Sequence, residues 1–277
     1  MSSENAQPTN PRIAPGSDAP LRQDGPFQHE VAENHERPER PGQAEDAQRP
    51  EHTDRDAAPQ FVLPLVVRIE KSAPPSRTDA LETAARAVLT LLGDERSTGE
   101  GEWARAVRDW QDARIRKVVR RARGAEWRKA SALPGITVEG RECEVRVFPP
   151  VPLDGWPKEL AKLQVSGTDL EDPEPPAPPE PGVPVLWLSP DVEMSAGKAM
   201  AQAGHGAQLA WWELSDAERT AWASAGPVPF ALAVRSADAE RWAGLVSRGL
   251  PVVRDAGFTE IEAGSRTVIA DHPALYP

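Results

Sequence analysis

The segment MSAGKAMAQAGHG (194–206) places a lysine where it could act on an anion. The segment follows an apolar run, so it is predicted to open a helix directly after a strand. The first turn of a helix presents free backbone N–H groups and a partial positive charge, which suit a phosphate or a developing oxyanion. Lys198 adds a cation there against the helix dipole, which favours a functional role. Gln202 and His205 are supporting candidates. A solvated lysine and a packed, hydrogen-bonded histidine are the structural alternatives.

A second segment, RDAGFTEIEAGSRTVIADHP (254–273), brings a carboxylate and two hydroxyls together. Asp255 ends a predicted strand, and Gly257 is expected to supply a positive φ in the turn that follows. Thr259 and Thr267 flank the next loop. These groups could orient a water molecule or hold a ribose. An Asx-turn with threonines in β positions is the structural alternative.

Together the two segments resemble the type 2 (archaeal and eukaryotic-type) peptidyl-tRNA hydrolases. Members of that family read approximately MGKGKxAAQxxHA after the first strand and LPxxxxDAGxTx[IV]xxG[ST]xTVLAIGP near the end. The chain reads MSAGKAMAQAGHG (194–206) and LPVVRDAGFTEIEAGSRTVIA (250–270), with the spacing intact. The resemblance covers about residues 183–277, which is one third of the chain.

The resemblance implies a mixed four-stranded sheet between helices. It also implies hydrolysis, without metal or cofactor, of the ester that joins a peptide to the 3′ ribose of tRNA. It implicates Lys198, Asp255, Thr259 and Thr267 in catalysis. Lys198 would contact phosphate or stabilise the oxyanion on the ester carbonyl. Asp255 would orient or deprotonate the attacking water, and the two threonines would hold water or the terminal ribose.

Three positions depart from the family pattern. Ala196 replaces a lysine, Phe258 occupies a position that is often basic, and His272-Pro273 stands in place of Gly-Pro. The first two changes remove positive charge near the expected tRNA end. Two alternatives to a peptidyl-tRNA hydrolase therefore stay open. One is a noncatalytic RNA- or protein-binding member of the family, and the other is a hydrolase of a different aminoacyl or peptidyl ester.

The residues before this segment repeat its plan, which predicts an internal duplication. Each block begins with an apolar run that fits a buried strand, 61–70 and 183–190, followed by an Ala-rich helix, 76–92 and 195–212. Further elements are predicted at 101–113, 114–122, 124–132, 133–140 and 142–148, and at 215–225, 228–236, 237–248, 250–257 and 266–273. The expected helix caps are Ser76 with Asp79, Ser195, and Ser215 with Glu218. The order β-α-α-β-α-β-β predicts two α/β/α-sandwich units with small mixed four-stranded sheets.

The first block lacks the chemistry of the second. Aligned at the helix caps, Asp79 stands opposite Lys198 and Arg77 stands opposite Ala196. No Asp-Ala-Gly-x-Thr sequence lies between its last two strands. If the first block is a copy of the second, it is therefore expected to be catalytically inactive.

Basic residues are concentrated in the first block. Six along its second predicted strand are candidates for binding tRNA phosphates: Arg114, Arg116, Lys117, Arg120, Arg121 and Arg123. A solvated basic face is the alternative. Three tryptophans nearby, Trp103, Trp110 and Trp127, are predicted to be core residues rather than platforms for bases.

Composition explains why the net charge of −11 does not exclude an RNA partner. A predicted disordered tail (1–58) and a Pro- and acid-rich linker (166–184) carry −6 and −5, whereas the blocks 59–165 and 185–277 carry +4 and −4. The single Cys143 excludes a disulfide framework. The first residues do not read as a signal peptide, and no apolar run reaches the roughly 18–20 residues of a membrane span. A cytoplasmic protein with no membrane partner is expected.

The sequence thus predicts a peptidyl-tRNA hydrolase whose partner is tRNA. The two blocks could pair within one chain as a pseudo-dimer, or the chain could form a homodimer.

Overall fold

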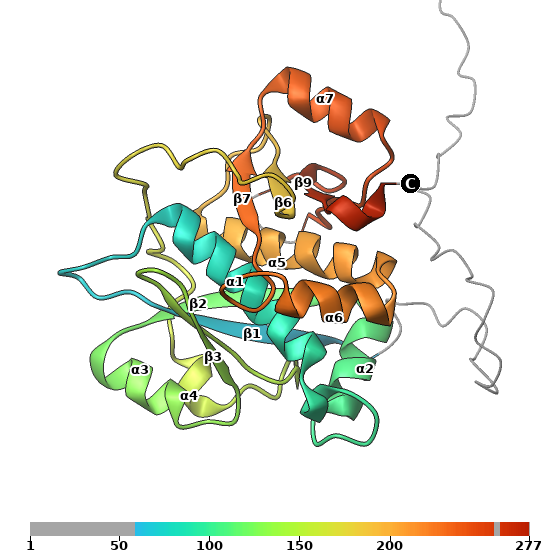
Figure 1. The fold of residues 1–277 in the computed structure, drawn as a ribbon. Helices are drawn as coiled ribbons and strands as arrows, with labels where there is room; N and C mark the ends of the chain where they lie inside the picture. Colours follow the sequence, from blue (N-terminus) through green and yellow to red (C-terminus); the bar gives the residue numbers. More distant parts are fainter. Residues whose placement is uncertain (1–58, 258–260, 277) are drawn as a thin grey trace, which may run out of the picture. The chain divides into compact units, whose positions relative to one another are not determined.

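The structure is a computed structural model that describes residues 59–257 and 261–276 (Figure 1). All of these residues belong to one compact unit, Pro50–Pro277. The predicted disordered tail, 1–58, lies outside the described residues. No helix within the described ranges is long and apolar enough to cross a membrane.

The first half of this unit follows the predicted order of helices and strands. Its elements are β1 (Phe61–Arg68), α1 (Arg77–Gly93), the short 3-10 helix η1 (Glu95–Ser97), α2 (Ala104–Asp112), β2 (Arg116–Ala122), α3 (Gly124–Ser131), β3 (Ile136–Glu139), β4 (Glu144–Val147), β5 (Val151–Pro152) and α4 (Lys158–Ala161). The last two elements were not predicted. β5 adds one short pairing to β1.

The second half repeats the order of the first. Its elements are β6 (Val185–Leu188), α5 (Ala196–Glu213), α6 (Asp216–Ser224), β7 (Ala233–Ser236), α7 (Ala239–Ser247), β8 (Val252–Arg254), β9 (Arg266–Asp271) and the 3-10 helix η2 (Pro273–Leu275). The strands β6, β7 and β8 are shorter at their ends than predicted.

The two sheets have the same strand order. The first runs β2-β1-β4-β3 and the second runs β7-β6-β9-β8. In each sheet the first two strands of the half are parallel, and the remaining pairings, which in the first sheet include that of β5 with β1, are antiparallel. The prediction of two small mixed sheets covered by helices is therefore confirmed.

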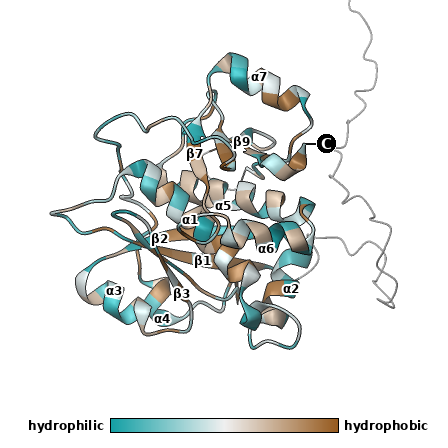
Figure 2. Cartoon of the chain, viewed as in Figure 1, coloured by the Kyte–Doolittle hydropathy of each residue, from teal (hydrophilic) through white to brown (hydrophobic). Residues whose placement is uncertain are grey.

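Successive side chains of a strand point to opposite faces of its sheet, and in both sheets each face carries apolar side chains. In β1, Leu63 and Leu65 point into a core that also contains α1 and α5, whereas Val66 packs against α3 and α4. In β6, Leu186 points into the same shared core, and Trp187 packs against α7. Helices α1 and α5 thus form a layer between the two sheets (Figure 1). Figure 2 shows the apolar colouring of β1 beneath these helices.

Helices α1 and α5 run in the same direction and contact each other along their length. The start of α1 reaches Met194, just before α5, and its last residue, Gly93, lies beside Trp211 near the end of α5. They approach closely at Gly204, where an added Cβ would lie 2.9 Å from a methyl group of Val88. Glycine at this position therefore lets the two halves share one core.

The predicted tryptophan core is confirmed. Trp103, Trp110 and Trp127 are all buried. Trp110 packs in the shared core and donates from its ring N–H to the carbonyl of Arg116 at 2.9 Å. A buried indole needs such an acceptor, so this contact fixes α2 against β2.

Two of the three predicted helix caps are confirmed. Ser195 caps α5, and Ser215 with Glu218 forms a full capping box at α6. Ser76 is the N-cap residue of α1 as predicted, but its side chain makes no cap hydrogen bond, and the Asp79 carboxylate accepts from residues 141–143 instead. Contacts with distant residues replace these local ones: Asp172 caps the start of α1, and Asp79 accepts from the β3–β4 loop.

The segment 166–184 contains no helix or strand, but it connects the starts of the two central helices. Thr168 Oγ1 accepts a hydrogen bond from the backbone of Gly197 in α5 at 3.0 Å. The Asp172 carboxylate accepts from the backbone N–H of Thr78 in α1 at 2.8 Å and from its hydroxyl at 2.7 Å. The segment therefore supplies the cap that Ser76 does not.

Candidate active site

Lys198 lies in the first turn of α5, at one edge of the second sheet. The helix begins there because Ser195 Oγ accepts from the backbone N–H of Lys198 at 3.4 Å. β6 is parallel to β7, and β8 runs the same way because β6 and β8 are both antiparallel to β9. The carboxyl ends of these three strands therefore share the edge at which α5 starts, the usual place for ligands in open α/β sheets.

Asp255 follows β8 directly and faces Lys198. Its Oδ2 lies 2.5 Å from Lys198 Nζ and accepts from Gln202 Nε2 at 2.7 Å. Its Oδ1 accepts from the backbone N–H of Gly257 at 2.8 Å. Gly257 has φ +75°, and an added Cβ would lie 2.7 Å from the Cβ of Ala263. The predicted turn is thus confirmed, and it holds the carboxylate in place.

Gln202 extends this group to Thr267. The buried Thr267 hydroxyl donates to Gln202 Oε1 at 2.6 Å, so the amide of Gln202 connects the hydroxyl to Asp255. Buried polar groups that satisfy one another in this way hold a single geometry. Four predicted site residues are therefore brought together: Lys198, Gln202, Asp255 and Thr267. Thr259 and Phe258 lie outside the described residues.

The geometry of the Lys198–Asp255 pair suits acid–base chemistry. The Lys198 side chain is 15% exposed and that of Asp255 is 5% exposed. A nearly buried ion pair is tolerated when further hydrogen bonds satisfy the carboxylate, as they do here. An oriented carboxylate beside an ammonium group can position a water molecule and stabilise an oxyanion. No cluster of three or more His, Cys, Asp or Glu residues placed to bind a metal occurs among the described residues.

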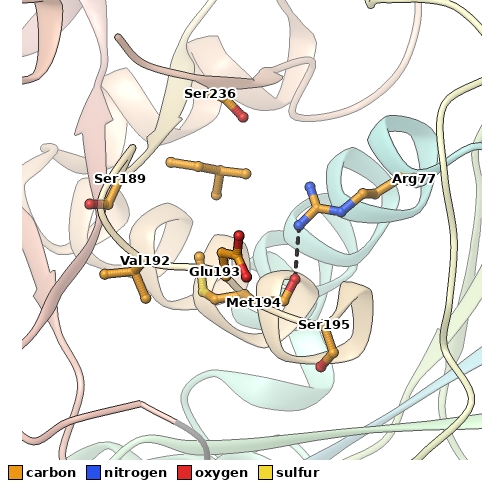
Figure 3. Close-up of a pocket in the computed structure, with 8 residues that line it drawn as sticks. Arg77, Ser189, Val192, Glu193, Met194, Ser195 and Ser236 are labelled. Carbon is orange, nitrogen blue, oxygen red and sulfur yellow. Dashed lines mark hydrogen bonds between the residues drawn. The ribbon is translucent and has the colours of Figure 1, made fainter. Parts of the chain in front are cut away.

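A pocket of about 670 Å³ adjoins this group at the ends of β6 and β7 (Figure 3). Ser189 connects the two features, because it lines the pocket and its backbone N–H donates to the carbonyl of Thr267 at 2.9 Å. Leu188, Val192 and Met194 supply apolar surface to the pocket. The pocket could not be predicted from the sequence, because its residues form no recognisable motif.

His205 does not join the group. It lies on the side of α5 that faces β2, where its Nδ1 is 3.2 Å from Lys117 Nζ. Lys117 is buried, donates to Gln208 Oε1 at 2.6 Å and lies 4.8 Å from the centre of the Trp110 ring. Burial lowers the pKa of Lys117 well below its usual value. Burial, with the positive charge of Lys117, lowers the pKa of His205 well below its usual value. This position supports a structural role for His205 between the two halves.

The lowered pKa of His205 predicts a pH dependence of stability. The unfolded chain takes up a proton at this histidine below about pH 6.5, whereas the folded chain does not, so acid favours unfolding. His205→Gln should therefore reduce the loss of unfolding free energy between pH 7 and pH 5 by about 1–2 kcal/mol. Urea unfolding of the wild type and of His205→Gln at pH 7 and pH 5 measures this difference in unfolding free energy. The same loss in both proteins would contradict the prediction, and comparison with wild type cancels the contribution of the carboxylates and of His272.

The basic strand β2 makes most of its contacts inside the chain. Lys117 is buried between the halves, so no phosphate reaches it. Arg120 donates to the carbonyl of Leu163, and Arg121 donates to the side chain of Gln164 and to the carbonyl of Ser166. The three other candidates, Arg114, Arg116 and Arg123, are half-buried. These contacts favour a structural role in which the arginines hold residues 161–166 against the edge of the first sheet.

The first half replaces the lysine–aspartate pair with a different contact. Asp79, at the position equivalent to Lys198, is buried and accepts from the backbone N–H groups of Arg141, Glu142 and Cys143 at 3.0, 2.7 and 2.9 Å. The carboxylate therefore closes the β3–β4 loop, which in the second half is the segment that carries Asp255. Burial raises the pKa of the Cys143 thiol, which makes it a poor nucleophile.

The second half is thus a small α/β domain with a hydrogen-bonded Lys–Asp–Gln–Thr group at the carboxyl edge of its sheet. Residues 183–276 match the family model of peptidyl-tRNA hydrolase PTH2, a range that spans the second half from β6 to η2. The first half lies outside the matched range. No curated protein and no solved structure matched the chain.

Proposed function

We propose that the protein hydrolyses the ester between a peptide, or an N-blocked amino acid, and the 3′ ribose of tRNA. The observation that carries this proposal is the hydrogen-bonded group of Lys198, Asp255, Gln202 and Thr267, placed inside the range that matches the family model of peptidyl-tRNA hydrolase PTH2. The fold alone would not carry it, since one fold serves many activities.

The proposed reaction is the attack of water on the ester carbonyl. Asp255 orients the water and accepts its proton, while the Lys198 ammonium group stabilises the oxyanion that develops on the carbonyl oxygen. Cleavage of the ester bond releases a peptide carboxylate and restores the 3′ hydroxyl of tRNA. Gln202 and Thr267 keep Asp255 in position. Thr259 stays in the proposal on the strength of the family resemblance.

Incubation of the full chain with N-acetyl-aminoacyl-tRNA tests this proposal. We expect the wild type to release the acylated amino acid and Lys198→Ala to be at least about a hundredfold slower, because removing one oxyanion donor costs about that much. Lys162→Ala is the matched control, since it removes the same charge from an exposed position and should keep wild-type activity. No turnover by the wild type, or equal turnover by all three proteins, refutes the proposal.

We further infer that the two halves arose by duplication and that the first half has lost the catalytic group. The duplication is supported by two similarities between the halves: helices and strands follow one another in the same order along the chain, and the strands have the same order in the sheet. The replacement of the lysine by Asp79 supports the loss of chemistry. The pairing of α1 with α5 supports an intrachain pseudo-dimer. Because the arginines of β2 contact the chain itself, the proposal places the 3′ end of the RNA at the second sheet rather than along β2.

A further inference from the structure

One residue of the first half reaches the pocket beside the candidate active site. Arg77, at the start of α1, lines the pocket together with residues of the second half (Figure 3). Hydrogen bonds hold both its backbone and its side chain in place. Its backbone N–H donates to the carbonyl of Glu171 at 3.2 Å, and its Nη2 donates to the carbonyl of Met194 at 3.2 Å.

The guanidinium of Arg77 retains donors for a ligand. Within the described ranges, no carboxylate forms an ion pair with it, and its one side-chain hydrogen bond goes to Met194. Figure 3 shows the group at the wall of the pocket, with only Nη2 joined to a neighbour. A planar guanidinium with free donors is well matched to a phosphate, to which it can donate two parallel hydrogen bonds.

The pocket adjoins the site that would hold the ester. Ser189 lines the pocket and bonds to the backbone of Thr267. Ser195 also lines it and caps the helix turn that carries Lys198. A single-stranded RNA end whose terminal ribose lies at Asp255 therefore has its adjoining nucleotide within reach of the pocket.

The pocket also contains a carboxylate, that of Glu193. Glu193 is exposed, so water and salt screen its charge, and it forms no ion pair with Arg77 among the described residues. A phosphate would be bound on the Arg77 side of the pocket. The serine hydroxyls and the apolar side chains Val192 and Met194 suit the remainder of a nucleotide.

We propose that Arg77 binds a backbone phosphate at the unpaired 3′ end of the RNA, so that the first half completes the substrate site of the second. This inference rests on the proposed function for the identity of the RNA. At the helix starts, Arg77 is the residue equivalent to Ala196, the position at which the second half lacks the lysine of its family. The first half thereby returns a cation to the site.

Binding of a labelled single-stranded oligoribonucleotide ending in CCA with a free 3′ hydroxyl tests the inference without any hydrolysis. Anisotropy titrations at several salt concentrations would compare the wild type with Arg77→Ala and Arg77→Gln. We expect both variants to bind about ten- to a hundredfold more weakly. The slope of log K against log salt should become shallower by about 0.7, the value for one phosphate contact on a single strand. Glutamine removes the charge while keeping an uncharged side-chain donor at this position.

Arg248→Ala is the matched control, because it removes an exposed arginine at the far end of α7 and should change neither affinity nor slope. Wild-type affinity and slope in Arg77→Gln would overturn the inference, and so would a wild type that does not bind the oligonucleotide. Weaker binding with an unchanged slope would also overturn it, since that outcome indicates a structural role. Binding that depends on Arg77 in a protein that hydrolyses no ester would leave this inference standing while the proposed function fails.

Discussion

Asp255→Asn should lower kcat for peptidyl-tRNA hydrolysis about a hundred- to ten-thousandfold, the range that a positioned acid–base group contributes. The asparagine is nearly the same shape and can still accept from Gly257. It cannot take a proton from water, and it removes the negative charge that lies 2.5 Å from the Lys198 ammonium. The change should therefore appear mainly in kcat, because the substrate contacts proposed for the pocket stay in place.

Single-turnover kinetics with saturating enzyme measures this effect separately from binding. Asp216→Asn is the matched control, because its side chain is 98% exposed and lies outside the site. It should react at the wild-type rate. Asp255→Asn with a rate within tenfold of the wild type, in a protein that remains folded by circular dichroism, would remove Asp255 from the proposed chemistry.

The site could be predicted where its residues lie close together in sequence or follow a strand end. Lys198 and Gln202 share one helix, and Asp255 precedes a glycine turn, so local spacing was sufficient to place each on its element. The hydrogen bonds that join them across the sheet depend on the order of the strands. That order was predicted only in outline.

His205 and Arg77 show where sequence reasoning stops. His205 is on the same helix as Lys198, yet it faces Lys117 of the other half, because α5 packs on β2 as well as on its own sheet. Arg77 is distant in sequence from the pocket that it lines. Both outcomes depend on the parallel packing of α1 on α5, and no periodicity within either helix determines that packing.

The distribution of charge along the sequence was a poor guide to the binding partner of β2. The arginines of β2 resembled a phosphate-binding stretch, but Arg120 and Arg121 donate to the carbonyls of residues 161–166. A carbonyl-rich irregular segment needs donors as much as an RNA backbone does, and composition cannot distinguish the two. The acidic segment 166–184 likewise uses Asp172 to cap α1.

The second large effect concerns stability rather than activity. Asp79→Ala should lower the free energy of unfolding by about 2–4 kcal/mol, because it leaves three backbone N–H groups of the β3–β4 loop, including that of the buried Cys143, without their acceptor. Gly140 allows the loop to come this close, since an added Cβ there would lie 2.5 Å from the Asp79 carboxylate.

The two aspartates should therefore separate stability from chemistry. Guanidinium unfolding measures the first, and turnover per folded molecule at low temperature measures the second. Asp79→Ala should keep kcat within about twofold of the wild type, whereas Lys198→Ala, at the equivalent position, should lose activity with a smaller change in stability because Lys198 is partly exposed. Asp154→Ala, at an exposed loop position, should change stability by less than about 0.5 kcal/mol. If Asp79→Ala instead abolished turnover in a folded protein, the first half would take part in the reaction, and its proposed loss of chemistry would be wrong.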